Sequence, residues 1–281
     1  MGGTPAGAGA AVNDPRELLD VASEAALHAG SLLRARFEAG HEQRIASKTT
    51  PTDPVSAADL ASQHAIRALI AERRPADAFL AEEEGANQTG SSGLQWVVDP
   101  LDGTVNFLYG IPQWCVSVAV FDAHGALAGV IHDPIGGETF AALRGELPSR
   151  NGVTLARRED PVPVIGQALV ATGFAYDERV RAEQGELIAR LLPLVRDIRR
   201  CGSAALDLAW TAMGRYDAYF ERGVKLWDIA AGVLVCECAG LVARPIDDGI
   251  LVAPAPLLDE LAAIIAGGAG ESAVREPDAA A

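Results

Sequence analysis

The chain has 281 residues, enough for one large domain or two closely joined ones, and none of its apolar runs reaches the roughly 18 residues that a membrane-spanning helix needs. Its 38 acidic residues outnumber 23 basic ones and give a formal net charge of −15, which argues against nucleic acid or an anionic membrane as the main partner. The four cysteines are too few and too irregularly spaced for a disulfide framework or a zinc finger, so we expect free thiols in a reducing compartment.

Both ends of the chain predict flexible tails. Residues 1–13 are rich in Gly and Ala without the basic region or long apolar core of a secretory signal, and residues 267–281 are similar but more polar. We therefore expect a cytoplasmic protein with a single domain over residues 14–266. The Pro-Val-Pro sequence at 161–163 is the best place for a division within it, which would give subregions of about 14–160 and 161–266.

Two helices and a short strand are predicted first. Residues 14–17 combine an acidic N-cap, a proline at the first helical position and a glutamate at the third, and apolar residues then recur at helical spacing to about residue 40. A second helix is expected from about residue 55 to residue 74, where a proline stops it. A strand is expected at 78–81, followed by three consecutive glutamates.

The rest of the chain predicts strands first and then strands mixed with helices. A strand at 95–99 precedes a β-meander whose turns contain glycine, with strands at 114–121, 126–132 and 138–143. The later elements are a strand at 168–171, helices at 177–195 and from 203, a strand at 217–221, a helix at 226–239, strands at 241–243 and 250–253, and a helix at 256–266. This order predicts layered α/β packing rather than a purely parallel sheet.

The most informative string is residues 96–107, in which Asp99 and Asp102 follow an apolar run and precede a Gly-Thr pair. On a regular strand the two side chains would point to opposite faces, but Pro100 predicts a bend where both can converge, with the carbonyl of Leu101 between them. Two unpaired carboxylates about 4 Å apart would repel by ~4 kcal/mol at an effective dielectric constant of about 20. A divalent cation removes that cost, so the string predicts a Mg²⁺ site beside a helix start that can bind phosphate, with an acidic, helix-capping turn as the alternative.

Three other segments carry candidate polar groups, and each also has an ordinary structural explanation. Glu82 and Glu83 follow a short strand and could be a solvated face or a metal ligand with its neighbour. Asp228 begins a helix of small residues and could be an N-cap or a ligand. In the polar loop before the second helix, Asp53 could cap that helix or reach the active site, and Lys48 could supply positive charge near a phosphate.

Several common catalytic motifs are absent from the sequence. It contains no Gly-x-Ser-x-Gly nucleophile elbow, no Walker loop and no Gly-x-Gly-x-x-Gly dinucleotide loop, and its five histidines are scattered. Covalent hydrolysis, ATP-driven transfer and NAD chemistry are therefore poorly supported. The acidic strings favour a metal-dependent phosphatase instead.

Taken together, these strings resemble the inositol monophosphatase family, within the wider group of lithium-sensitive, magnesium-dependent sugar phosphatases. The similarity extends from about residue 14 to residue 266 and is carried, in this order, by residues 48–59, 82–83, 99–107, 202–205 and 227–228. It implies alternating α-β-α-β-α layers and hydrolysis of inositol monophosphate or a similar polyol phosphate by in-line attack of a metal-activated water. It also implies two to three Mg²⁺ per subunit, with Mn²⁺ possible, inhibition by Li⁺, and a homodimer.

The resemblance also implies roles for individual residues. The implied metal ligands are all oxygen donors: Glu82, Asp99, the carbonyl of Leu101, Asp102 and Asp228. The implied catalytic residues are Asp53, Glu83 and Thr104, and the implied substrate-binding residues are Lys48, Gly103, Thr104, Ala204 and Glu221. Thr104, paired with Asp53, would orient and polarise the attacking water. The backbone N–H groups of Gly103 and Thr104 would bind the phosphate, and Glu221 would accept hydrogen bonds from ring hydroxyls.

Other functions stay open at this point. Relatives with this fold hydrolyse fructose 1,6-bisphosphate, histidinol phosphate or a phosphoadenosine nucleotide, although residues 105–112 and Glu221 favour the inositol branch. A non-catalytic protein on the same scaffold, for example a partner of the transcription machinery, belongs to another class; the presence of every implied metal ligand argues against it as the main role. An acidic α/β domain without metal is the third possibility.

Overall fold

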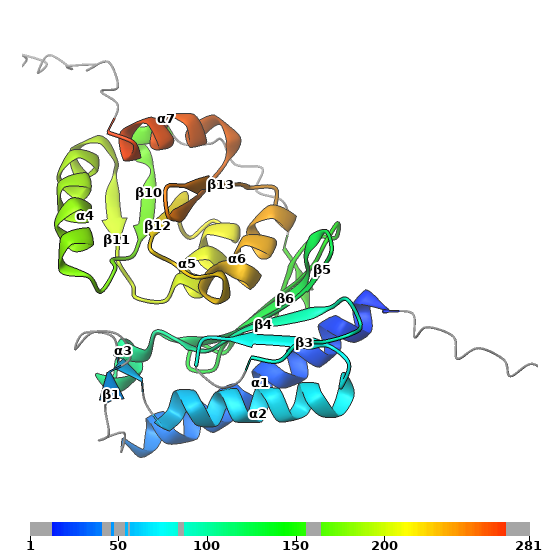
Figure 1. Cartoon of the computed structure of the whole chain (residues 1–281). Coiled ribbons are helices and arrows are strands. Elements are labelled where there is room, and N and C mark those ends of the chain that lie inside the picture. Colours follow the sequence, from blue (N-terminus) through cyan, green and yellow to red (C-terminus); the bar gives the residue numbers. More distant parts are fainter. Residues whose placement is uncertain are drawn as a thin grey trace, which may run out of the picture.

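The computed structural model describes residues 13–40, 57–83, 87–155 and 164–267, together with the backbone of two short strands at 46–47 and 54–55. Five layers alternate along the molecule: a helix pair, a sheet, a second helix pair, a second sheet and an outer helix pair (Figure 1). The predicted α-β-α-β-α arrangement is confirmed. The predicted tails and the division near residues 161–163 fall largely or wholly outside the described residues, so that domain organisation stays a prediction.

The first layer contains the two predicted N-terminal helices, α1 (Pro15–Ala39) and α2 (Ala57–Arg73). Asp14 caps α1 by accepting a hydrogen bond from the N–H of Arg16, and Gly40 ends the helix in the left-handed conformation, with φ of 68°. The apolar face of α1 is fully buried against the first sheet. Capping and periodicity therefore fix this layer locally, as the sequence predicts.

The first sheet has seven strands in the order β3-β4-β5-β6-β7-β8-β9. Their bounds are β3 (Ala78–Ala81), β4 (Gln95–Asp102), β5 (Cys115–Asp122), β6 (Gly125–Asp133), β7 (Glu138–Leu143), β8 (Ser149–Arg150) and β9 (Val153–Thr154). Only the β3–β4 pair is parallel; the other neighbours are antiparallel. The predicted meander is confirmed, while the short β8–β9 hairpin was not predicted. A separate two-stranded sheet pairs β1 (Ala46–Ser47) with β2 (Pro54–Val55).

The second sheet has five strands in the order β11-β10-β12-β14-β13. Their bounds are β10 (Leu169–Thr172), β11 (Asp197–Arg199), β12 (Ala218–Arg222), β13 (Val242–Ile246) and β14 (Gly249–Ala253). The middle helices α5 (Ala204–Ala212) and α6 (Leu226–Cys238) pack between the two sheets, and α4 (Glu178–Leu191) and α7 (Ala255–Ile265) cover the far face. The two sheets therefore share one helix layer, and the N-termini of both its helices contribute to the site described below.

Some predicted boundaries were wrong for identifiable reasons. The helix expected to extend to residue 195 ends at Leu191 and continues only as a 3₁₀ turn (Leu192–Leu194), because Pro193 lacks an N–H group for the helical ladder. The strand expected at 95–99 continues to Asp102, with a shift in its pairing with β5 between Asp99 and Asp102. The 3₁₀ turn at Ile165–Gln167 and the edge strand β11 were not predicted.

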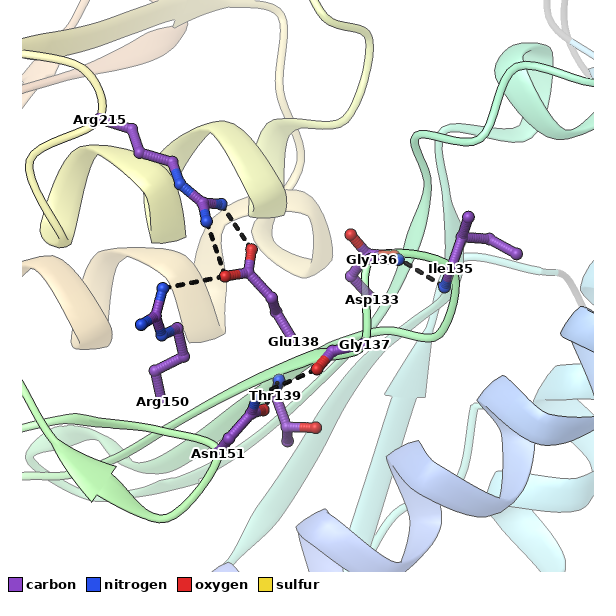
Figure 2. Close-up of polar contacts among 9 residues, drawn as sticks. All are labelled: Asp133, Ile135, Gly136, Gly137, Glu138, Thr139, Arg150, Asn151 and Arg215. Carbon is purple, nitrogen blue, oxygen red and sulfur yellow. Dashed lines mark hydrogen bonds and ion pairs between the residues drawn. The ribbon is translucent and has the colours of Figure 1, made fainter.

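Glu138, at the start of β7, connects the first sheet to the middle helix layer (Figure 2). Arg215, which follows α5, donates to Oε1 of Glu138 at 2.7 Å, and Arg150 on β8 donates to the same oxygen at 3.1 Å. On the adjoining turn, Asn151 donates to the carbonyl of Gly137 and accepts from the N–H of Thr139. These bonds hold the β6–β7–β8 edge in place, well separated in sequence from the acidic strings.

No helix in the described ranges is long and apolar enough to be a candidate membrane span. All four cysteines are free thiols, as expected, with Cys115 and Cys236 buried and Cys201 and Cys238 partly exposed.

Candidate active site

Asp99 and Asp102 lie at the end of β4 and are 2% and 8% exposed. Asp99 accepts a hydrogen bond from the N–H of Leu101 at 3.0 Å. Between the two aspartates the strand loses regular pairing with β5, so the expected irregularity is present as a shift of register within a strand rather than as the end of the strand. This shift releases the two side chains from strict alternation between the faces of the sheet.

Asp102 is held by the N-terminus of α5, which belongs to the next layer. The hydroxyl of Ser203 and the N–H of Ala205 both donate to Oδ2 at 2.7 Å, and the N–H of Ala204 donates to Oδ1 at 3.3 Å. Burial raises the pKa of Asp102, and these hydrogen bonds oppose that effect. Ser203 caps α5, as its sequence position predicts, but its contact with Asp102 could not be foreseen from local sequence.

The acidic side chains from separate segments act on one another. Burial raises the pKa of Asp99 well above its usual value, and the charges of three neighbours raise it further: Glu82, Asp102 and Asp228. Burial likewise raises the pKa of Asp228, with a hydrogen bond from the N–H of Lys225 opposing the effect. The first sheet and the first turn of α6 therefore bring four carboxylates close enough to repel one another.

The chemistry of these donors fits Mg²⁺. Within the described ranges, no three Asp, Glu, His or Cys side chains converge tightly enough to hold a metal ion in their present positions. The charges of Glu82, Asp102 and Asp228 nevertheless raise the pKa of Asp99, and a divalent cation bound among these carboxylates would remove that repulsion. All candidate donors are hard oxygens, the ligand type that Mg²⁺ prefers.

Thr104, the first residue of α3 (Thr104–Leu108), contacts a carboxylate that was not among the residues predicted from the sequence. Its hydroxyl lies 2.8 Å from Oδ1 of Asp59, a fully buried residue of α2, and 3.1 Å from the carbonyl of Leu101. The predicted partner, Asp53, lies outside the described residues. The predicted pairing of Thr104 with Asp53 therefore stays a prediction, and the structure adds Asp59 as a partner of the hydroxyl.

A sequence signal for Asp59 did exist. The buried face of α2 carries three polar residues at i, i+3 and i+4 spacing, Asp59, Ser62 and Gln63, where an apolar stripe is usual. Ser62 donates to the carbonyl of Pro100 at 2.6 Å, and the side chain of Gln63 exchanges hydrogen bonds with the backbone of Glu83. The polar part of this face therefore holds the segments that carry the candidate ligands.

The two neighbouring glutamates have different environments. Glu82 is partly exposed and is one of the charges that act on Asp99. Glu83 is buried, and its backbone is fixed by Gln63. This arrangement is consistent with Glu82 as a ligand, while a catalytic role for Glu83 stays a prediction.

On the second sheet, Glu221 borders the same region. Tyr219 donates its hydroxyl hydrogen to Oε2 of Glu221 at 2.7 Å. Burial raises the pKa of Glu221 to about 7, while this hydrogen bond and the charge of Arg200 oppose the effect. A Cβ atom at Gly173 would lie 2.1 Å from the carboxylate, so a side chain at this position would displace the Glu221 carboxylate from its present place. Lys48 is the other charged residue that was predicted to contact the substrate, and it lies outside the described residues.

Gly103 makes the turn between β4 and α3 possible. Its φ is 97°, in the left-handed region that favours glycine, and a Cβ atom there would lie 3.1 Å from both the carbonyl oxygen of Gln113 and the Cβ of Trp114. The turn places Thr104 next to Leu101 and Asp59, beside the carboxylates of β4.

Comparison with known proteins establishes the family. The model of the inositol monophosphatase family matches residues 14–272. The chain belongs to this family. It is 39% identical over 275 residues to the inositol-1-monophosphatase SuhB of Mycobacterium tuberculosis, with 90% of this chain and 94% of the relative covered. It is 40% identical over 247 residues to the Nus factor SuhB of Pasteurella multocida, with 85% and 91% covered.

Solved structures agree with this membership of the inositol monophosphatase family. The extragenic suppressor protein suhB of Bartonella henselae matches with a TM-score of 0.82 and 30% identity over 89% of this chain and 98% of that chain. The resemblance inferred from the acidic strings and the fold it implied are thus confirmed. The names of these relatives differ, so family membership leaves the substrate to be argued.

Proposed function

We propose that this member of the inositol monophosphatase family is a Mg²⁺-dependent phosphomonoesterase that hydrolyses inositol monophosphate or a similar polyol phosphate. The observation that carries the proposal is the mutual repulsion of Asp99, Asp102 and Asp228 beside the Thr104–Asp59 pair. A phosphate dianion would not approach such a group, in a chain of net charge −15, unless cations neutralised it. The substrate and the metal are therefore parts of one hypothesis.

The proposed Mg²⁺ ligands divide into two sets. Glu82, Asp99 and the carbonyl of Leu101 would hold the first ion. Asp99, Asp102 and Asp228 would hold the second, and a third, more loosely bound ion would lie near Glu82. When bound, Mg²⁺ supplies positive charge to the phosphoryl oxygens and lowers the pKa of the attacking water.

In this proposal the protein itself orients the water and receives its proton. Thr104 donates its hydroxyl hydrogen to Asp59, so the lone pairs of the Thr104 oxygen are available to a water molecule. As that water attacks phosphorus and the ester P–O bond breaks, Thr104 takes the water proton and passes its own proton to Asp59, and the leaving oxygen takes a proton from solvent to form the alcohol. Asp59 is fully buried, which keeps bulk water from competing for this role. The N–H groups of Gly103 and Thr104 would bind the phosphate.

The side of the site that faces the leaving alcohol is formed by the second sheet and α5. Glu221, oriented by Tyr219, would accept hydrogen bonds from substrate hydroxyls. Ala204 presents only a methyl group at the start of α5, next to Asp102, which leaves space for a ring. A polyol with several hydroxyls suits this wall better than an apolar alcohol.

A panel of phosphate esters assayed with Mg²⁺ tests the proposal. The panel contains inositol monophosphate, fructose 1,6-bisphosphate, histidinol phosphate and a phosphoadenosine nucleotide. We expect Mg²⁺-dependent phosphate release with inositol monophosphate among the best substrates, and loss of release in Asp102→Asn. Activity on histidinol phosphate alone would overturn the inositol assignment, and no release from any ester would overturn the phosphatase itself.

A role in partner binding is the second candidate, favoured by the relatives named Nus factor SuhB. Pull-down assays with Asp102→Asn separate the two roles. Retained capture of a transcription component together with lost phosphate release would show two separable functions. Capture without any wild-type hydrolysis would make binding the main role.

Four further properties belong to the same proposal and each has its own test. A homodimer would be seen by light scattering after size exclusion. Inhibition by Li⁺ would appear as reduced turnover at millimolar concentrations, and Mn²⁺ would substitute for Mg²⁺ in a metal titration. The free cysteines are consistent with a cytoplasmic location, which fractionation of the source cells checks.

A further inference from the structure

Asn106, in the short helix α3, connects the two layers that form the candidate site. Its side chain is buried, with the residue 6% exposed. The side-chain nitrogen donates to the carbonyl oxygen of Gln113 at 2.7 Å and to that of Cys201 at 2.8 Å. Both acceptors are carbonyls, so the orientation of the amide is fixed by its partners. Both of its N–H hydrogens are used in these bonds.

The two segments that accept hydrogen bonds from Asn106 belong to different layers of the protein. Gln113 precedes β5 in the first sheet, whereas Cys201 immediately precedes the turn that presents Ser203 to Asp102. Asn106 itself lies two residues after Thr104, in the turn proposed to bind phosphate. One side chain therefore joins the phosphate turn, on one layer, to the segment that holds Asp102, on another.

The contact between α3 and the turn before α5 leaves little space for either backbone to move. Gly202 has φ of 94°, and a Cβ atom there would lie 2.9 Å from the side-chain nitrogen of Asn106. A Cβ atom at Gly103 would lie 3.2 Å from the carbonyl oxygen of Gly202. Two glycines thus let the backbones of α3 and the α5 turn approach closely, and Asn106 occupies the contact between them.

We propose that Asn106 is a positioning residue that holds the N-terminus of α5 against the phosphate turn and so keeps Asp102 in place. The consequence for catalysis rests on the proposed function, because it assumes that Asp102 takes part in Mg²⁺ binding. The first ligand set consists of Glu82, Asp99 and the carbonyl of Leu101, which follow or end strands of the first sheet. It does not depend on the contact between Asn106 and the turn before α5. Loss of Asn106 therefore affects the second ligand set and spares the first.

The test compares Asn106→Ala with Asn151→Gly. Asn151 also bridges two backbone groups through its side-chain amide, at Gly137 and Thr139, but on the β7–β9 edge, and glycine suits its φ of 51°. Hydrogen exchange in the absence of metal measures the amide protection of residues 203–206 and of residues 95–99. Two lost hydrogen bonds of ordinary strength predict exchange at 203–206 that is about tenfold or more faster in Asn106→Ala, with 95–99 unchanged.

The second measurement is how Asn106→Ala changes Mg²⁺ binding and the Mg²⁺ dependence of turnover. We expect the half-saturating Mg²⁺ concentration for turnover to rise about tenfold in Asn106→Ala, while calorimetry shows one Mg²⁺ binding event weakened and another, assigned to the first ligand set, unchanged. Asn151→Gly should match the wild type in both measurements. If Asn106→Ala does not fold, Asn106→Leu carries the same test, because it has a similar volume, removes the donor and adds no charge.

The outcomes separate this inference from the proposed function. Unchanged exchange at 203–206, or the same acceleration in Asn151→Gly, overturns the positioning role whatever the activity. If Asn106→Ala exchanges faster at 203–206 but binds Mg²⁺ equally more weakly at both ligand sets, the proposed selective effect on the second ligand set is wrong. A wild type that shows no Mg²⁺-dependent hydrolysis overturns the proposed function, and the exchange result then still decides whether Asn106 positions α5.

Discussion

Ser203 donates its hydroxyl hydrogen to Oδ2 of Asp102 at 2.7 Å, and this bond joins the start of α5 to the end of β4. The N–H of Ala205 meets the same oxygen at 2.7 Å. The carboxylate of Asp102 therefore cannot rotate without losing hydrogen bonds from a different layer. The candidate site is built at the contact between a sheet and a helix layer, and the precision of its acidic groups depends on how those layers are joined.

Replacing Ser203 with alanine tests this relationship. This substitution removes the hydrogen bond to Asp102, with a typical net value of about 0.5–1.5 kcal/mol, and the longer N-cap bond from the N–H of Leu206, at 3.4 Å. It should raise the half-saturating Mg²⁺ concentration for hydrolysis about three- to tenfold. Turnover at saturating Mg²⁺ should change less. Thr211→Val is the control, because that buried hydroxyl on the same helix donates to the carbonyl of Asp207, within α5, at 2.7 Å. Equal changes in both variants would indicate a general loss of α5 stability instead.

The sequence predicts the site best where its residues are adjacent in the chain. Asp99, Asp102 and Thr104 lie within one string, so their proximity follows from the chain itself. The contact between Thr104 and Asp59 could not be predicted this way, because the two residues are 45 positions apart and only the packing of α2 on β4 brings Asp59 to the hydroxyl. The sequence pattern of a helix shows which of its faces is buried, but it does not show which residues that face contacts.

The missed strands have a similar explanation. The strands β8, β9 and β11 have only two or three residues each, too few to show the alternation that identifies a strand. The edge strand β11 exists because it pairs in parallel with β10. The long helices α1, α2 and α6 carried caps or extended periodic stripes and were predicted to within a few residues.

Asp59→Asn tests the proposed proton acceptor. The amide keeps nearly the same shape but cannot take a proton from Thr104, so we expect kcat to fall by about 10²- to 10⁴-fold, the usual contribution of a general base. The half-saturating Mg²⁺ concentration should stay close to that of the wild type, since Asp59 is not among the proposed ligands. Steady-state kinetics across a Mg²⁺ titration measures both quantities.

Ser62→Ala provides the comparison for Asp59→Asn. Ser62 lies one turn further along the same face of α2 and bonds the carbonyl of Pro100, so its loss disturbs packing near the site without removing a proton acceptor. A similar fall in kcat for both variants would count against Asp59 as the base. A fall confined to Asp59→Asn, with a normal circular dichroism spectrum, would support it.

The carboxylates should make stability depend on pH in a direction that Mg²⁺ reverses. Burial raises the pKa values of Asp99, Asp228 and Glu221, so the folded protein binds more protons than the unfolded chain between the ordinary and raised values. Without divalent ions, stability should therefore fall as pH rises; for Glu221 the window is about 4.5 to 7.

Mg²⁺ binds the ionised carboxylates and should oppose this trend. At 100 times its dissociation constant it would add about 2.7 kcal/mol to the free energy of unfolding. At one fixed Mg²⁺ concentration, the gain should be larger at pH 8 than at pH 6, because more of the carboxylates are ionised at pH 8. Thermal unfolding in EDTA and in Mg²⁺ across this pH range measures the effect. Asp228→Asn should flatten the EDTA curve and weaken the Mg²⁺ response. A melting temperature in EDTA that rises with pH would contradict the proposed arrangement of charges.

The pH dependence of hydrolysis should report on Glu221 and its neighbour Arg200. With a pKa of about 7, Glu221 is protonated as the pH falls through neutrality and becomes a weaker acceptor for substrate hydroxyls, so kcat/KM should decline on the acid side. The positive charge of Arg200 lowers the pKa of Glu221, so Arg200→Gln should move the acid limb to higher pH. Arg199→Gln is the matched control, since Arg199 pairs with the exposed Asp197 instead. An acid limb that stays in place in Arg200→Gln, or that persists in Glu221→Gln, would assign it to another group.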